Sequence, residues 1–106
     1  MNESIALTEG VYYILLSLFS PLHGYGIMQN VEALSEGRVR LAAGTLYGAI
    51  STMLDKGWIQ ALTSEANSRK KEYIITDQGK AVAAAELARL RELVRNGETM
   101  MGGKLQ

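Results

Sequence analysis

Three consecutive basic residues, Arg69-Lys70-Lys71, stand out as groups with a clear chemical use. They lie between two segments rich in β-forming residues, so we expect them at the tip of a β-hairpin. Cationic side chains at such a tip can bind phosphate groups along a nucleic-acid backbone. The alternative is a tip that only aids solubility, and three adjacent cations favour phosphate contact over that reading.

Polar side chains also share one face of an expected helix over residues 43–56. Thr45, Ser51 and Thr52 lie opposite the apolar stripe of that helix, so burial explains them poorly. Small hydrogen-bonding groups of this kind can reach base edges in a DNA major groove, whereas the alternative is plain solvent exposure. Tyr47 is equally suited to a sugar or phosphate contact and to half-buried packing near the helix start.

The sequence offers little to catalysis. It has no cysteine, which excludes thiolate chemistry and a disulfide framework, and a zinc site is not expected. His23 is the single histidine, and no nucleophile or second histidine accompanies it. We find no Gly-rich phosphate loop and no acidic pair at catalytic spacing. We therefore expect no catalytic residue, no metal ligand and no cofactor, and we assign His23 to a turn or a helix cap.

The length of 106 residues predicts a single domain. A hydrophobic content of 47% and a single proline are typical of an ordinary folded chain. The most apolar stretch, residues 11–19, is about half of the roughly 20 residues that span a bilayer. A signal peptide begins with basic residues, but residues 1–37 contain no Lys or Arg. These features predict a soluble, cytoplasmic protein without a membrane partner.

The formal net charge is zero, which taken alone argues against a nucleic-acid partner. The charges are nevertheless segregated along the chain. Residues 1–37 carry four acids and no bases, residues 38–71 carry six bases and two acids, and residues 72–106 carry five of each. The net charges of these thirds are therefore minus four, plus four and zero. The positive third contains both the polar helix and the basic tip, which favours binding to a nucleic acid.

Apolar spacing and capping residues predict the elements that position these groups. We expect helices over about 8–20, 25–35, 43–56 and 77–96, strands over 58–63 and 71–76, and at most a short strand over 38–41. Trp58 is expected to close the core where the hairpin begins. The fold class is mainly α with a small β-hairpin, in the order of a winged helix-turn-helix. In that fold, the third helix is presented to the DNA major groove by its two predecessors.

The last expected helix has an apolar seam that predicts a homodimer. Ala83, Leu87, Leu90 and Val94 follow one another at intervals of four, three and four residues. This seam could pack on its own subunit, but the preceding segment of about seventy residues can form a core without it. We therefore divide the domain into a winged helix-turn-helix over about 5–76, a dimerisation helix over about 77–96 and a flexible tail over 97–106.

Five blocks of sequence, in order, resemble the PadR-like transcriptional regulators, and the resemblance covers about residues 7–94. The blocks are Pro21-Leu22-His23-Gly24-Tyr25, Gly44-Thr45-Leu46-Tyr47, Lys56-Gly57-Trp58-Ile59, Arg69-Lys70-Lys71-Glu72-Tyr73 and Thr76-Asp77-Gln78-Gly79. The resemblance implies a homodimer that binds double-stranded DNA, usually a repressor. In some short members the final helices surround a cavity for hydrophobic small molecules, so an effector at the dimer interface is implied as well.

The third helix departs from the family pattern. The family usually has Pro after the Tyr and a Lys or Arg soon afterwards, whereas this sequence has Gly48, Ser51 and Thr52. Lys56, the wing and the amino end of the helix should then carry more of the affinity, and binding should be modest and strongly salt-dependent. The last helix also lacks the tryptophan that lines the pocket of some drug-binding short members.

A second hypothesis is a protein-interaction module that keeps the winged fold but does not bind DNA. Net neutrality and the uncharged polar face of the third helix favour it. Salt-sensitive binding to DNA separates the two hypotheses. A small enzyme is a third class, and the missing nucleophile and base argue against it.

Overall fold

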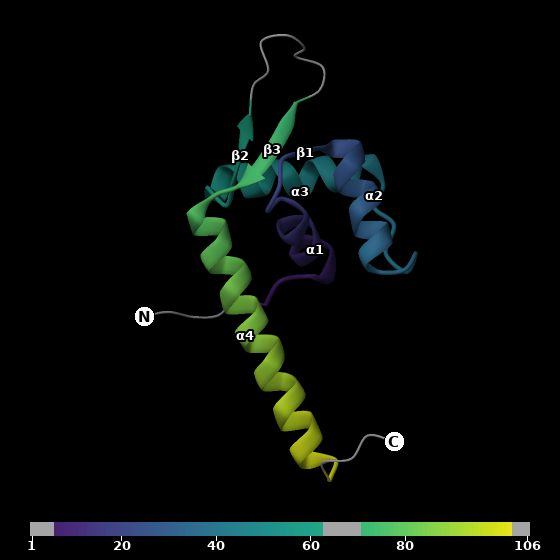
Figure 1. Ribbon diagram of the computed structural model, residues 1–106, viewed down its shortest axis with the longest axis vertical. Helices are drawn as coiled ribbons and strands as arrows, with labels where there is room; N and C mark the ends of the chain where they lie inside the picture. Colours follow the sequence, from purple (N-terminus) through teal and green to yellow (C-terminus); the bar gives the residue numbers. More distant parts are fainter. Residues whose placement is uncertain (1–5, 63–70, 103–106) are drawn as a thin grey trace.

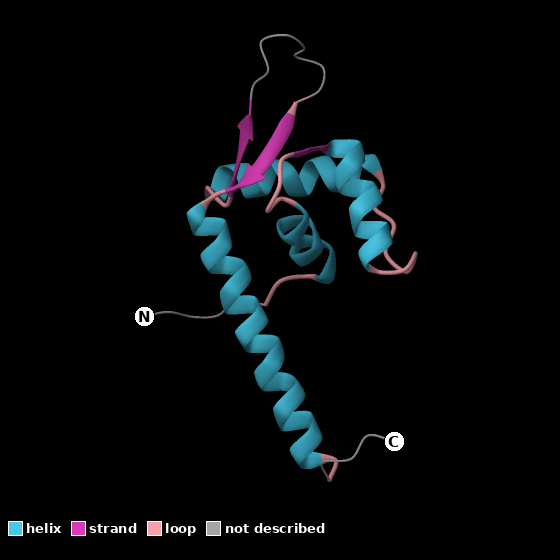
Figure 2. Ribbon diagram, in the orientation of Figure 1, coloured by secondary structure: helices cyan, strands magenta, loops and turns pink. Residues whose placement is uncertain are grey.

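The computed structural model describes residues 6–62 and 71–102, which form four helices and a small antiparallel sheet (Figures 1 and 2). In chain order the elements are α1 (Glu9–Ser17), β1 (Leu22–His23), α2 (Gly24–Leu34), α3 (Ala43–Lys56), β2 (Ile59–Leu62), β3 (Glu72–Ile75) and α4 (Asp77–Met100). Helices α1 to α3 gather beneath the sheet, whereas α4 runs past them and extends well beyond the rest of the fold (Figure 1).

Side-chain caps begin three of the helices. The Thr8 hydroxyl accepts a hydrogen bond from the Val11 amide at 3.1 Å, and His23 Nδ1 accepts one from the Gly26 amide at the same distance. Each bond satisfies an amide that the first helical turn leaves without a partner. The predicted capping role of His23 is therefore confirmed. The first helix is shorter than expected, because it ends at Ser17.

The sheet contains one strand more than the expected hairpin. Strand β3 lies in the centre and pairs antiparallel with β2 and with β1, where Leu22 lies opposite Tyr73. The sequence allows at most a short strand over residues 38–41, and the structure has none there. A side chain takes the place of a strand partner in this segment: the Ser35 hydroxyl accepts a hydrogen bond from the Val39 amide at 2.9 Å. A two-residue strand such as β1 is too short to produce a recognisable alternation of apolar residues.

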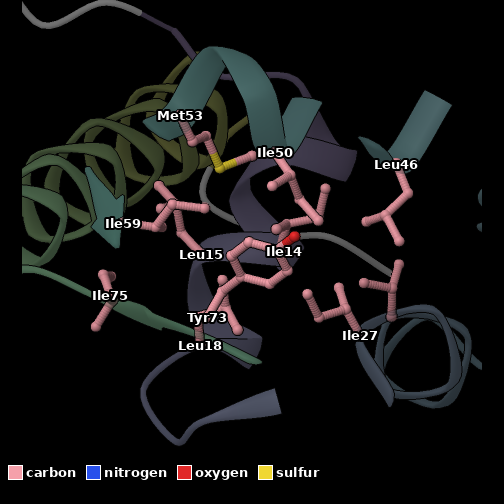
Figure 3. Packing of buried hydrophobic residues seen from close by; sticks show 11 residues of the cluster. Ile14, Leu15, Leu18, Ile27, Leu46, Ile50, Met53, Ile59, Tyr73 and Ile75 are labelled. Carbon is pink, nitrogen blue, oxygen red and sulfur yellow. The ribbon is translucent and has the colours of Figure 1, made fainter. Parts of the chain in front are cut away.

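One apolar cluster joins the three short helices to the sheet (Figure 3). Helix α1 lies at its centre, since Ile14, Leu15 and Leu18 are almost completely buried. The other buried members come from α2, α3 and the strands: Ile27, Val31, Leu46, Ile50, Met53, Ile59, Tyr73 and Ile75. Trp58 packs against this cluster from its edge, as predicted. The cluster holds α3 by one face and leaves the opposite face open.

A glycine joint fastens α4 to the end of α3. Gly57 has a left-handed backbone (φ 79°) and ends α3, while its carbonyl accepts a hydrogen bond from the Thr76 hydroxyl at 2.6 Å. The Thr76 amide donates to the Trp58 carbonyl at 2.9 Å. Gly79 follows at the same place, where an added Cβ would lie 2.0 Å from that carbonyl oxygen. Only glycine permits this close approach, which sets the direction of α4 relative to α3.

Helix α4 is longer than the sequence predicts. It continues through Gly97 to Met100, so the expected stop at Asn96 is wrong. A glycine inside a helix costs only about 1 kcal/mol relative to alanine, and the turns on either side outweigh that cost. Within residues 6–62 and 71–102, no helix combines the length and the apolar character needed to cross a membrane.

A buried carboxylate connects α4 to the start of α1. The Glu86 side chain is only 3% exposed, and it accepts hydrogen bonds from Arg89 at 2.9 and 2.6 Å and from the Leu7 amide at 3.4 Å. Hydrogen bonding to Arg89 lowers the pKa of Glu86, and the Leu7 amide acts in the same direction, against the opposing effect of burial. The carboxylate is therefore held in its charged form.

We expect Glu86→Gln to lower the Tm by about 3 °C at neutral pH, because it removes a charged acceptor from a buried network. The pKa of Glu86 in the folded chain lies below its usual value of 4.5, so this stabilisation is complete above that pH and disappears as the pH falls through the lowered pKa. Thermal melts between pH 3 and 7 would show the two curves converging at low pH. The exposed Glu92→Gln on the same helix is the control, and an equal loss there would contradict the assignment.

Candidate nucleic-acid interface

The outward face of α3 carries the predicted DNA-contacting residues. Leu46, Ile50 and Met53 are buried on the inner face, whereas Thr45, Ser51 and Thr52 are exposed. The Thr52 hydroxyl donates a hydrogen bond to the Gly48 carbonyl at 3.2 Å, and its oxygen keeps lone pairs that can still accept. The structure thus brings the three predicted side chains to one solvent-facing surface.

The structure places Tyr47 half-exposed between α3 and the start of α2, as the packing interpretation expects, and the sugar or phosphate contact stays a prediction. The Tyr47 side chain is 49% exposed, and its hydroxyl lies against the start of α2, where an added Cβ on Gly24 would be 2.1 Å from the tyrosine oxygen. Tyr47 also lies near Tyr73. Burial is the main cause that raises the pKa of Tyr73, and the charge interaction with Tyr47 raises it further. Tyr47 therefore packs α3 against the start of α2 while about half of the residue remains exposed to solvent.

The amino end of α3 is open to an anion. Ala42 precedes the helix and provides no side-chain cap, in contrast to Thr8, His23 and Thr76 at the other helices. The following residues, Ala43 to Thr45, are exposed. Unpaired amides and the positive end of the helix dipole favour a phosphate at such a position.

The basic third of the sequence is partly neutralised in three dimensions. Arg38 forms a two-point ion pair with Glu9, which lowers the pKa of that carboxyl, and Arg40 lies 3.4 Å from Glu32. Both acids belong to the amino-terminal third. Lys56 and Lys71 are exposed, whereas the predicted contacts Arg69 and Lys70 lie outside the described residues. The cations available to phosphates are thus fewer than the sequence count indicates.

Gly48 lies in the middle of the outward face of α3, and nothing approaches within 4 Å of the position of an added Cβ. We expect Gly48→Ala to raise the free energy of unfolding by about 0.5 to 1 kcal/mol, because alanine loses less backbone entropy in a helix. Urea denaturation measures this gain. Gly97→Ala on α4 is equally unobstructed and should stabilise similarly. A loss of stability in Gly48→Ala alone would show that the position is constrained within the fold.

The predicted dimerisation seam divides into a buried and an exposed part. Ala83 is only 4% exposed in the single chain, so α4 uses this residue to pack on its own subunit. Leu87 and Val94 are 41% and 59% exposed, and with Leu90 they line an open groove of about 420 Å³ on α4. Leu93 and Met100, which the seam did not include, are exposed as well. Leu93 lies within the predicted helix but off the seam spacing, whereas Met100 belongs to α4 only because the helix extends beyond residue 96.

The described residues contain no group of three histidine, aspartate or glutamate side chains that could hold a metal ion. The exposed polar groups described above lie on the outward face of α3 and at its open amino end. This arrangement offers hydrogen-bond donors, acceptors and a few cations to an extended polyanion.

Solved structures of several transcriptional regulators have a similar fold. PadR family regulators from Eggerthella lenta (22% identity, TM-score 0.70, 86% of this chain and 80% of that one) and Clostridium difficile (20% identity, TM-score 0.68, 88% and 96%) share the fold. Bordetella bronchiseptica BpsR, whose DNA binding is regulated by 6-hydroxynicotinic acid, is similar over the whole chain and 72% of its own length (15% identity, TM-score 0.71). No curated protein matches.

Residues 11–85, more than half of the sequence, match the transcriptional regulator PadR-like family. The match includes most of α1, the helix-turn-helix, the wing strands and the first turns of α4. The expected mainly helical winged fold is confirmed, with a three-stranded sheet in place of a simple hairpin. The chain therefore belongs to the PadR-like family of DNA-binding transcriptional regulators.

Proposed function

We propose that the protein is a dimeric repressor that binds operator DNA with α3 in the major groove and the wing along the phosphate backbone. The observation that carries this proposal is the outward face of α3, where Thr45, Ser51 and Thr52 stand exposed beside an uncapped helix end. Small polar side chains on a helix with little bulk suit close approach to base edges.

Different groups on this surface carry affinity and specificity. The amino end of α3, Lys56 and the wing residues Arg69, Lys70 and Lys71 contact phosphates and set the strength and salt dependence of binding. Ser51 and Thr52 contact base edges and set the preferred sequence. Tyr47, which is about half exposed, contacts the sugar-phosphate backbone.

Leu87, Leu90 and Val94 form the dimer contact on α4, since a monomer would leave this apolar surface in water. We expect the double variant Leu87→Glu/Val94→Glu to shift the protein from dimer to monomer at micromolar concentration, as measured by light scattering. Because both side chains are exposed in the single chain, its helix content should not change. Glu98→Gln is a control outside the groove. A parent protein that is already monomeric would contradict the proposed dimer.

A small hydrophobic effector at the dimer interface is proposed to release the repressor from DNA. BpsR provides the precedent of a structurally similar regulator whose DNA binding responds to a small molecule. Such a ligand would need to bind the DNA-free arrangement of the two subunits more tightly than the DNA-bound one.

Selection from random duplexes tests the proposal. We expect the purified protein to enrich one palindromic sequence whose half-sites are about one helical turn apart, or somewhat more widely spaced. Binding to the enriched duplex should exceed binding to random DNA at moderate salt and weaken steeply as the salt concentration rises. The absence of any enriched sequence would refute specific binding.

A protein-interaction module without DNA binding is the second candidate. It is favoured by the pairing of Arg38 and Arg40 with acids and by the exposed Asp55 at the end of the α3 face. Two results together would favour this second candidate. The protein would bind one defined protein partner through the α3 face, and its DNA binding would be negligible and insensitive to salt.

A further inference from the structure

Side chains in the segment between α2 and α3 alternate between packed and exposed positions. Val39 and Leu41 pack against the apolar cluster, whereas Arg38 and Arg40 are exposed. The Val39 amide donates a hydrogen bond to the Ser35 hydroxyl, and the segment then leads to the start of α3 beside α2 (Figure 1). The backbone is therefore held on both sides of Arg40, and the arginine side chain can change position without moving it.

The two ion pairs of this segment differ in strength. Arg38 donates two hydrogen bonds to the Glu9 carboxylate, one of them at 2.8 Å. Arg40 makes a single contact of 3.4 Å between its Nε and a Glu32 carboxylate oxygen, and its side chain is 74% exposed. Charged N–H···O bonds are usually about 2.7 to 2.9 Å long, so the second pair is loose. An exposed pair of this kind stabilises the fold little and readily exchanges one anion for another.

Arg40 lies close to the end of α3 that faces DNA in the proposed function. It precedes Ala43, the first residue of α3, by three positions, which an extended chain spans in about 10 Å at most. The residues from Ala43 to Thr45 are exposed, and Ala42 leaves the helix without a side-chain cap. A guanidinium binds phosphate in the same two-point manner as carboxylate. A DNA strand that passes the start of α3 therefore offers Arg40 an alternative to Glu32.

We propose that Arg40 is a further phosphate-contacting residue and that Glu32 competes with DNA for it. This inference rests on the proposed function, because it adds a contact to the same DNA-binding surface. When DNA binds, Arg40 exchanges the Glu32 carboxylate for a backbone phosphate, and the carboxylate returns to solvent. Arg38 stays with Glu9, because a two-point pair is harder to break. Glu32 therefore limits the affinity for all DNA sequences alike, since phosphates carry no sequence information.

Glu36 provides a matched control for Glu32. Both acids are exposed near the carboxyl end of α2, but the ion pairs among the described residues include Glu32 and not Glu36. We would measure binding of the full-length protein to a random-sequence duplex by fluorescence anisotropy at several salt concentrations. Glu32→Gln should raise the affinity about threefold for each subunit, or about tenfold for a dimer, because an exposed ion pair no longer competes. Glu36→Gln removes the same charge and should raise the affinity less than about twofold.

Variants of Arg40 test whether the gain depends on this arginine. Arg40→Gln should weaken binding and reduce the slope of log affinity against log salt by about 1 for each subunit. In the Arg40→Gln background, adding Glu32→Gln should raise the affinity no more than adding Glu36→Gln does. Thermal melts check the fold, and these exposed substitutions should each change the Tm by less than about 3 °C.

Equal gains from Glu32→Gln and Glu36→Gln would overturn the proposal, because the effect would then come from charge alone. A gain from Glu32→Gln that persists without Arg40 would also overturn it, and so would an Arg40→Gln protein with the affinity of the parent. Because the probe is a random duplex, a failure to find an operator would refute the specific repressor while this comparison still decides the role of Glu32. A parent protein that binds no duplex at all would overturn both proposals.

Discussion

Replacing Gly79 with alanine is expected to lower the free energy of unfolding by about 3 kcal/mol and the Tm by about 15 °C. The new Cβ would lie 2.0 Å from the Trp58 carbonyl oxygen and 2.7 Å from a side-chain carbon of Ile75. The oxygen belongs to the backbone and already accepts a hydrogen bond from the Thr76 amide, so it cannot move without breaking the joint between α3 and α4. Urea denaturation and thermal melts measure the loss.

Gly97→Ala on the same helix is the matched control, because nothing lies within 4 Å of its added Cβ. That variant should be slightly more stable than the parent protein, since alanine favours the helix. A Gly79→Ala protein within about 0.5 kcal/mol of the parent, the usual range for unconstrained surface changes, would mean that the first turn of α4 can slide away from Trp58 at little cost. The joint would then not determine the direction of α4.

The double variant Lys70→Ala/Lys71→Ala is expected to weaken binding to all DNA sequences by about tenfold at moderate salt. Lys71 is exposed next to β3, and Lys70 precedes it in the chain. Phosphate contacts carry no sequence information, so operator and random duplexes should lose affinity equally. The plot of log affinity against log salt should become less steep by about 1 for each phosphate contact removed. Fluorescence anisotropy at several salt concentrations provides both quantities.

Two further variants test whether the position of a side chain, and not only the number of positive charges, determines its effect on DNA binding. Arg38→Gln removes a positive charge from the same third of the chain, but Arg38 is already paired with Glu9, so the salt dependence should hardly change. Ser51→Ala/Thr52→Ala should instead change which sequence is preferred, because these side chains are assigned to base edges. If the lysine variant changed sequence preference and the Ser51/Thr52 variant changed only the salt slope, the assigned roles would be reversed.

The net charge of zero is uninformative about the surface that we propose meets DNA. The segregation along the chain indicates a basic region, and the structure then reduces that region by pairing Arg38 with Glu9 and Arg40 with Glu32. These partners are far apart in the sequence, so no count over a contiguous segment can reveal their contact. The expected modest, salt-sensitive affinity follows more directly from the paired structure than from the count.

Local chemistry allowed the sequence to specify much of this protein. Thr8, His23 and Thr76 cap the helices that follow them, and Gly57 ends α3, because these roles depend on a few neighbouring residues. Apolar spacing was sufficient to predict the burial of Leu46, Ile50 and Met53 and the exposed polar face of α3. Leu54, which the same spacing assigns to the buried stripe, is 37% exposed. The order of elements and the five sequence blocks were sufficient to predict the family.

Only the tertiary structure decided the features that depend on contacts between distant segments. Strand β1 exists because β3 offers it a partner, and α4 passes through Gly97 because its neighbouring turns outweigh one glycine. Ala83 is buried by its own subunit, which neither seam spacing nor hydrophobicity can distinguish from burial by a partner chain. The need for glycine at position 79 likewise comes from a carbonyl 21 residues earlier, at Trp58. Sequence patterns indicate which face of a helix or strand is apolar. Which residues cover that face depends on packing in three dimensions.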